Sequence, residues 1–105
     1  MKKSFTTEEA KMIGEKLGID WSKYNVEQFR MGMDVELEHG SVNQLTNITG
    51  DDPMSTGKIA LAHLNELPDY YTRLAKMEQE GENTFILKGY FDKKILIMEN
   101  KICFL

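Results

Sequence analysis

The sequence predicts an α+β fold, in which a four-helix N-terminal unit is followed by a small C-terminal antiparallel β-meander. Apolar residues recur at helical spacing behind recognisable caps from about Thr7 to Gly81, and short apolar runs separated by turn residues follow from Thr84. With 105 residues, 41% hydrophobic and 29% charged, the chain has the size and balance of one globular domain. We therefore expect a single domain over residues 1–105, with the helical unit over 1–81 and the meander over 82–105.

Caps and apolar stripes predict the first two helices. Thr6-Thr7-Glu8-Glu9 fits the capping-box pattern and predicts a helix from about Thr7 to Leu17, which Gly18 ends. Asn25 can cap a second helix that Gly40 ends. Its apolar stripe consists of Val26, Phe29, Met33 and Leu37. A polar, turn-rich loop then runs from Ser41 to Asp51.

Asp52-Pro53 is a cap followed by a first-turn proline, and it predicts a third helix that Pro68 interrupts. A fourth helix should restart at Asp69-Tyr70-Tyr71 and end near Gly81. The runs expected to form the β-meander are Thr84–Leu87 with Tyr90-Phe91, Ile95–Met98, and Ile102–Leu105.

Composition argues against several classes of protein. A net charge of −4 is the wrong sign for a protein that binds nucleic acid directly by neutralising phosphates, and it fits a protein partner with a basic groove better. The single cysteine, Cys103, cannot form an internal disulfide, which favours the cytoplasm. No apolar run approaches the ~18 residues of a membrane span, so we expect no membrane association.

Two carboxylate–histidine pairs at i, i+3 spacing are the most informative residues. On the second helix, at about 100° per residue, Glu36 falls inside the apolar stripe with His39 beside it, whereas Glu38 falls on the far side. Gly32 removes bulk next to this pair and leaves room for something to approach. His63 and Glu66 repeat the pattern on the third helix.

These pairs predict a metal site between the second and third helices, with Glu36, His39, His63 and Glu66 as ligands. Asp51 or Asp52 could replace one ligand or accept a hydrogen bond from a histidine. Imidazole and carboxylate donors favour zinc, with iron or manganese as alternatives.

The same four residues can also be explained by structural roles that involve no metal ion. His39 can be a cation at the C-terminus of a helix, His63 a hydrogen-bonded core histidine, and both glutamates half-exposed. Tyr70-Tyr71 is interpreted as a packed aromatic pair.

The segment from Phe5 to Glu80 resembles a family of small, uncharacterised bacterial and phage proteins. The resemblance is carried by EEAKMIGEKLGIDW, QFRMGMDVELEHG and DDPMSTGKIALAHLNELPDYYTRL. It implies a helical unit with a shared ELEHG and LAHLNE core, but no activity. The chain also looks like a phage anti-CRISPR protein of the zinc-containing kind. That resemblance implies a cytoplasmic inhibitor in the host cell, which binds a type II CRISPR-Cas effector nuclease and blocks loading of target DNA.

Taken together, these observations predict a non-enzymatic, zinc-binding inhibitor protein. Two alternatives stay open. One is a metal-dependent hydrolase, in which Glu38 or Asp51 serves as the base. The other is a helical protein-interaction module without metal.

Overall fold

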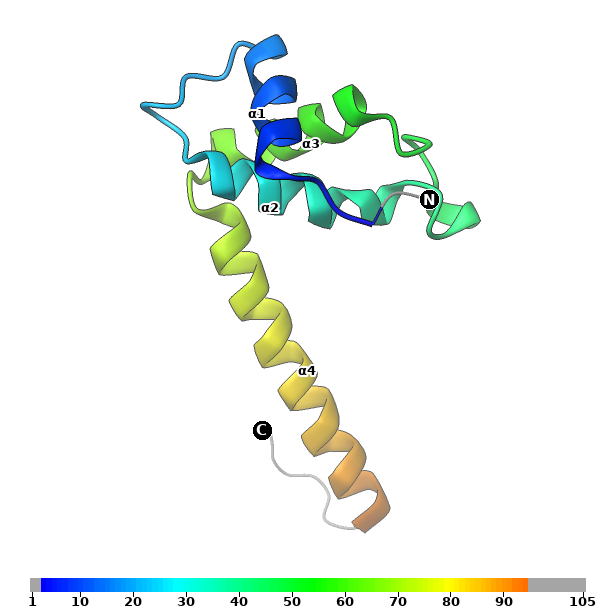
Figure 1. The fold of residues 1–105 in the computed structure, drawn as a ribbon. Coiled ribbons are helices and arrows are strands. Elements are labelled where there is room, and N and C mark those ends of the chain that lie inside the picture. Colours follow the sequence, from blue (N-terminus) through cyan, green and yellow to red (C-terminus); the bar gives the residue numbers. More distant parts are fainter. Residues whose placement is uncertain (1–2, 95–105) are drawn as a thin grey trace. The chain divides into compact units, whose positions relative to one another are not determined.

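The computed structural model describes the backbone of residues 3–94 and the side chains of residues 3–82. Its α-helices are α1 (Thr7–Lys16), α2 (Val26–Glu36), α3 (Pro53–Glu66) and α4 (Tyr70–Lys94). Two 3-10 turns, η1 (Leu37–His39) and η2 (Gln44–Thr46), lie between α2 and α3 (Figure 1). The chain divides into two compact units; the first is Met1–Thr72, and the second begins at Arg73 within α4.

The predicted caps start the helices where the sequence indicated. Thr6 caps α1 with a reciprocal box: its hydroxyl accepts from the Glu9 amide at 3.0 Å, and the Glu9 carboxylate accepts from the Thr6 amide at 2.9 Å. Asn25 caps α2, and Asp52 caps α3 with Pro53 in the first turn. These bonds satisfy amides that the first turn of a helix leaves without partners.

The second helix ends earlier than its apolar stripe suggested. The α-helical bonding stops at Glu36, and the chain continues through Leu37–His39 as a 3-10 turn before Gly40. Since a 3-10 turn has about three residues per turn, side chains after Glu36 leave the axis at different angles from those of an α-helix. This change affects Glu38 and His39 directly.

The core of the first unit lies where α2 packs against both α1 and α3. Phe29 and Met33 of α2, Leu64 of α3 and Tyr71 of α4 are fully or almost fully buried there. Trp21 packs edge-on against Phe29, with 5.9 Å between ring centroids. Burial of these side chains is the main favourable contribution to the stability of this unit.

The predicted β-meander is wrong, and so is the α+β fold class. The segments Thr84–Leu87 and Tyr90-Phe91 belong to α4, which continues to Lys94 instead of ending near Gly81, and residues 3–94 contain no strand. In the sequence, Ile86 and Tyr90 are four residues apart, as are Leu87 and Phe91, a spacing that suits a helix as well as a strand run. The other two predicted strands lie outside the described residues.

Within residues 3–94, no helix combines the length and the apolar character that crossing a lipid bilayer requires.

Candidate metal centre

Glu36 is a buried carboxylate in the last turn of α2. It is 3% exposed and shares its position with the core residues Phe29 and Met33 of the same helix. The helical angle read from the sequence placed Glu36 inside the apolar stripe, and its burial agrees with that placement. A buried charge is costly unless hydrogen bonds or a cation compensate it.

The two oxygens of Glu36 have different surroundings. Oε2 accepts a hydrogen bond from the hydroxyl of Tyr71 at 2.7 Å. Oε1 is buried and finds no hydrogen-bond partner among the described residues. One side of the carboxylate is therefore fixed by a donor, and the other is available to a further ligand.

The hydroxyl of Tyr71 stays protonated and can therefore donate its hydrogen bond to the Glu36 carboxylate. Burial raises the pKa of Tyr71 far above its ordinary value, and the hydrogen bond to Glu36 raises it further. The phenol consequently stays protonated throughout the physiological range. The Tyr71 ring also stacks on Tyr70, with 5.0 Å between centroids, as expected for the aromatic pair.

Gly32 makes room for Tyr71. A Cβ built on Gly32 would lie 2.3 Å from Cε2 of the Tyr71 ring. The sequence indicated space beside Glu36 at this glycine, and the aromatic side chain that fills it is Tyr71. Gly32 lies one turn before Glu36, so a ring that crosses the helix at Gly32 reaches the Glu36 carboxylate. That spacing indicates space for a side chain beside Glu36, but tertiary packing decides that Tyr71 is the residue that occupies it.

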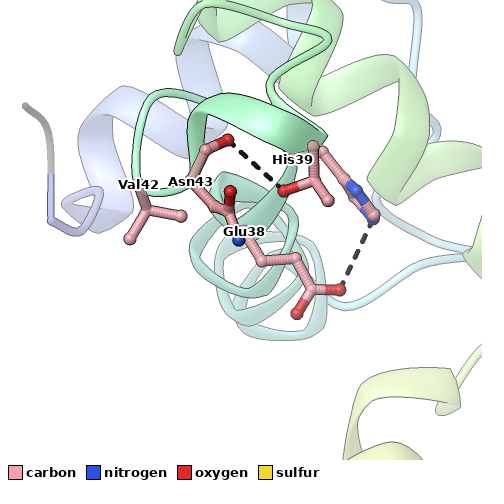
Figure 2. A pocket seen from close by; sticks show the side chains of 5 residues that line it. Glu38, His39, Val42 and Asn43 are labelled. Atoms are coloured by element: carbon pink, nitrogen blue, oxygen red, sulfur yellow. Dashed lines mark hydrogen bonds and ion pairs between the residues drawn. The ribbon is translucent and has the colours of Figure 1, made fainter.

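His39 and Glu38 approach the open side of Glu36. The Nε2 atom of His39 lies 3.5 Å from Oε1 of Glu36 and 3.4 Å from Oε2 of Glu38. One ligand atom from each of these three residues lies within 4.8 Å of the others. Figure 2 shows the ring of His39 and the carboxylate of Glu38 turned toward each other. The three side chains could therefore hold a metal ion together.

His63 lies on the opposite side of the Glu36 carboxylate. Its Nε2 is 3.7 Å from Oε2 of Glu36, and its Nδ1 is 3.5 Å from Oε1 of Glu66. The ring meets Tyr70 edge-on, with 4.3 Å between centroids. The four predicted ligands thus do not meet at one point: Glu36 contacts both histidines, whereas Glu66 contacts only the far nitrogen of His63 among these residues.

Asp51 and Asp52 are neighbours in the chain, and each carboxylate makes hydrogen bonds to a different serine. The carboxylate of Asp51 accepts from both the amide and the hydroxyl of Ser41, which closes the loop between them. Asp52 accepts from the amide and hydroxyl of Ser55 at the start of α3, and these bonds lower the pKa of its carboxyl. Both carboxylates are engaged in local hydrogen bonds.

The loop also bonds to the backbone of His39. The His39 carbonyl accepts from the amides of Ile48 and Thr49, at 2.6 and 3.1 Å. Beside it is a groove with a volume of about 540 Å³, lined by Glu38, His39, Val42, Asn43 and Thr46 (Figure 2). The candidate metal centre therefore borders this groove through two of its three donors.

Two features escaped the sequence reasoning. Glu38 was placed on the far side of the helix, because the angle assumed α-helical geometry beyond Glu36, where the chain is a 3-10 turn. Tyr71 was interpreted only as part of a packed aromatic pair, and its hydrogen bond to Glu36 was not predicted. The centre supported by the described geometry is Glu36, Glu38 and His39, with Tyr71 and His63 behind Glu36.

Comparison with known proteins identifies one family. The family described as a protein of unknown function (DUF5661) matches residues 10–80. Neither the curated proteins nor the solved structures contain a match.

Proposed function

Because the chain belongs to the DUF5661 family of proteins of unknown function, its role must be argued from its own residues, and we propose that it is a non-enzymatic protein that binds one divalent cation. The proposed ligands are Glu36, Glu38 and His39.

The buried Oε1 atom of Glu36 is the observation that carries this proposal. It has no hydrogen-bond donor among the described residues, and the ligand atoms of Glu38 and His39 are close to it. An ionised carboxylate buried to this degree needs a compensating charge or donor. A divalent cation between the three side chains supplies that charge.

Tyr71 and His63, which lie beside Oε2 of Glu36, would help to fix the orientation of its carboxylate. In this proposal Tyr71 holds Oε2 by its hydroxyl, and His63 stands beside the same oxygen. Glu66 lies beside the other side of the ring, with its Oε1 3.5 Å from Nδ1 of His63, and would help to hold the imidazole next to Glu36. Such outer contacts orient metal ligands and commonly change metal affinity when they are lost.

Zinc is the cation that suits this donor set best. One imidazole nitrogen and two carboxylate oxygens are compatible with tetrahedral zinc, while iron and manganese also accept these donors. A cation that binds only the folded chain also stabilises the fold, by about 2.7 kcal/mol when its free concentration is 100 times the Kd.

The expected protein partner stays a prediction, and so does the inhibition of a type II CRISPR-Cas effector nuclease. The proposal made here concerns the cation alone.

Elemental analysis of protein purified without chelator, and again after dialysis against zinc, tests the proposal. We expect one zinc per chain in the unmodified protein and a large loss in Glu36→Gln and in His39→Gln. Glu15→Gln is the matched control, because Glu15 is an exposed glutamate on α1. It should keep the full zinc content.

Two results would overturn the proposal. The first is unmodified protein that takes up no zinc, iron or manganese although circular dichroism shows it to be folded. The second is equal metal content in the Glu36→Gln variant and in the control.

A further inference from the structure

We infer that Tyr71 makes the proposed centre selective for zinc over manganese, because its hydroxyl limits the Glu36 carboxylate to binding the cation through one oxygen. The inference rests on the proposed function and adds the residue that decides which cation the centre prefers. Tyr71 does not itself bind the cation. It acts through Glu36 and is therefore a positioning residue.

The two oxygens of Glu36 face different groups. On the Oε1 side lies Nε2 of His39, at 3.5 Å, and this nitrogen is 3.4 Å from Oε2 of Glu38. On the Oε2 side, the hydroxyl of Tyr71 donates a hydrogen bond at 2.7 Å. Nε2 of His63 is 3.7 Å from the same oxygen, which is beyond hydrogen-bond distance. The proposed ligands therefore approach Glu36 at one oxygen, while Tyr71 holds the other.

Coordination through both oxygens of Glu36 would disturb the bond to Tyr71. Oε2 would have to turn toward His39 and away from the Tyr71 hydroxyl. The tyrosine ring cannot readily follow into α2, because it already lies so close to Gly32 that a Cβ there would be 2.3 Å from Cε2. Tyr71 is 1% exposed and Glu36 is 3% exposed, so bulk water does not reach this bond. A buried donor that loses its partner is costly.

The spacing of the donor atoms fits a cation with few, short bonds. Around tetrahedral zinc, with bonds of about 2.0–2.1 Å, neighbouring ligand atoms lie about 3.3–3.4 Å apart. The two distances from Nε2 of His39, 3.5 Å to Glu36 and 3.4 Å to Glu38, are close to this value. Manganese favours six ligands, most of them oxygen, and would gain more from a second oxygen of Glu36. A Glu36 that offers one oxygen therefore disfavours manganese more than zinc.

Tyr71→Phe tests this role, because it removes the hydroxyl and keeps the ring. Affinity for Zn²⁺ is measured by competition with a chelating indicator, and affinity for Mn²⁺ by the paramagnetic resonance signal of the free ion. We expect the ratio of zinc affinity to manganese affinity to fall about tenfold in Tyr71→Phe. Tenfold corresponds to about 1.4 kcal/mol, which is the scale of one buried hydrogen bond.

Tyr24→Phe is the matched control, since it removes a tyrosine hydroxyl that donates to Asn65 at an exposed position. The ratio of the two affinities in Tyr24→Phe should equal that of the unmodified protein.

Cobalt-substituted protein provides a second measurement that needs no variant. Four-coordinate Co²⁺ absorbs visible light much more strongly than six-coordinate Co²⁺, so the intensity reports the number of ligands. We expect strong absorption in the unmodified protein and in Tyr24→Phe. Absorption should be weaker in Tyr71→Phe, in which Oε2 of Glu36 is released to bind the ion.

The outcomes separate the two proposals. Folded, unmodified protein that binds none of Zn²⁺, Mn²⁺ and Co²⁺ overturns the proposed function, and this inference with it. Equal weakening of Zn²⁺ and Mn²⁺ binding in Tyr71→Phe overturns this inference alone, because a merely structural role of Tyr71 would have that effect. Weak absorption of the six-coordinate kind in the unmodified Co²⁺ protein also overturns this inference alone, and it does so even where Tyr71→Phe fails to fold.

Discussion

The ring of Tyr71 lies directly against the backbone of Gly32, so closely that a Cβ on Gly32 would be 2.3 Å from Cε2 and 2.8 Å from Cδ2. This contact lets a side chain from the first turn of α4 pass α2 and donate to the buried carboxylate of Glu36. The glycine thus determines both the packing of Tyr71 and the orientation of the candidate ligand.

Gly32→Ala should destabilise the metal-free protein by about 1–3 kcal/mol, because the added methyl group must displace a fully buried aromatic ring. Chemical denaturation followed by circular dichroism measures the change. Gly81→Ala is the control, since a Cβ at this helical glycine meets nothing within 4 Å. Alanine favours helix over glycine, so the control should not lose stability. Equal stability of Gly32→Ala and the unmodified chain would contradict this account of the packing.

Tyr71→Phe should cost about 1–3 kcal/mol of folding stability, because it leaves a buried carboxylate oxygen without its donor while the ring is retained. Denaturant unfolding of metal-free protein gives the value. Tyr24→Phe is a suitable comparison, since the hydroxyl of Tyr24 donates to Asn65 at an exposed position. A smaller loss is expected there, and an equal or larger one would show that burial of the Glu36 contact does not matter.

The raised pKa of Tyr71 also predicts how stability depends on alkaline pH. Below its ordinary value of 10.0 the phenol is protonated in both states, so its contribution to stability is complete. Above that pH the unfolded chain releases a proton that the folded chain retains, and stability should fall as pH rises. Unfolding free energies measured across this range should decline less steeply in Tyr71→Phe than in the unmodified protein. Parallel declines would contradict the raised pKa.

Gly40→Ala should loosen the loop over residues 41–50. A Cβ at Gly40 would be 1.9 Å from Oδ1 of Asp51, so this carboxylate has to move away from Ser41. We expect faster hydrogen exchange at the Ser41 amide, and a similar effect in Asp51→Asn. Asp20→Asn changes a carboxylate that bonds to Ser22 in the same local manner outside this loop. The Asp20→Asn variant should leave hydrogen exchange at the Ser41 amide unchanged. If Gly40→Ala also leaves that exchange unchanged, Asp51 does not hold the loop through Ser41 as described.

Local signals predicted the helical part of the fold well. Thr6 with Glu9, Asn25, and Asp52 with Pro53 each start a helix where expected, because capping depends on residues only two or three positions apart. The C-terminal prediction failed because short apolar runs such as Thr84–Leu87 fit a helix and a strand equally well. Only the continuous bonding of α4 through Lys94 decides between them.

The candidate site was predictable in part for similar reasons. The burial of Glu36 follows from its position within one helix, and the approach of His39 follows from i, i+3 spacing. The inclusion of Glu38 depends on a transition to 3-10 geometry that no pattern in the sequence indicated. The hydrogen bond from Tyr71 joins residues 35 positions apart, so it depends on tertiary packing.

The two contacts of His39 use separable parts of the residue. Its imidazole approaches the carboxylates, while its carbonyl accepts the amides of Ile48 and Thr49. Every amino acid carries that carbonyl, so exchange of the ring for a thiolate or a carboxylate need not disturb the attachment of the loop. Position 39 is therefore suited to redesign of metal preference, since the donor atom can be varied while the surrounding backbone is retained.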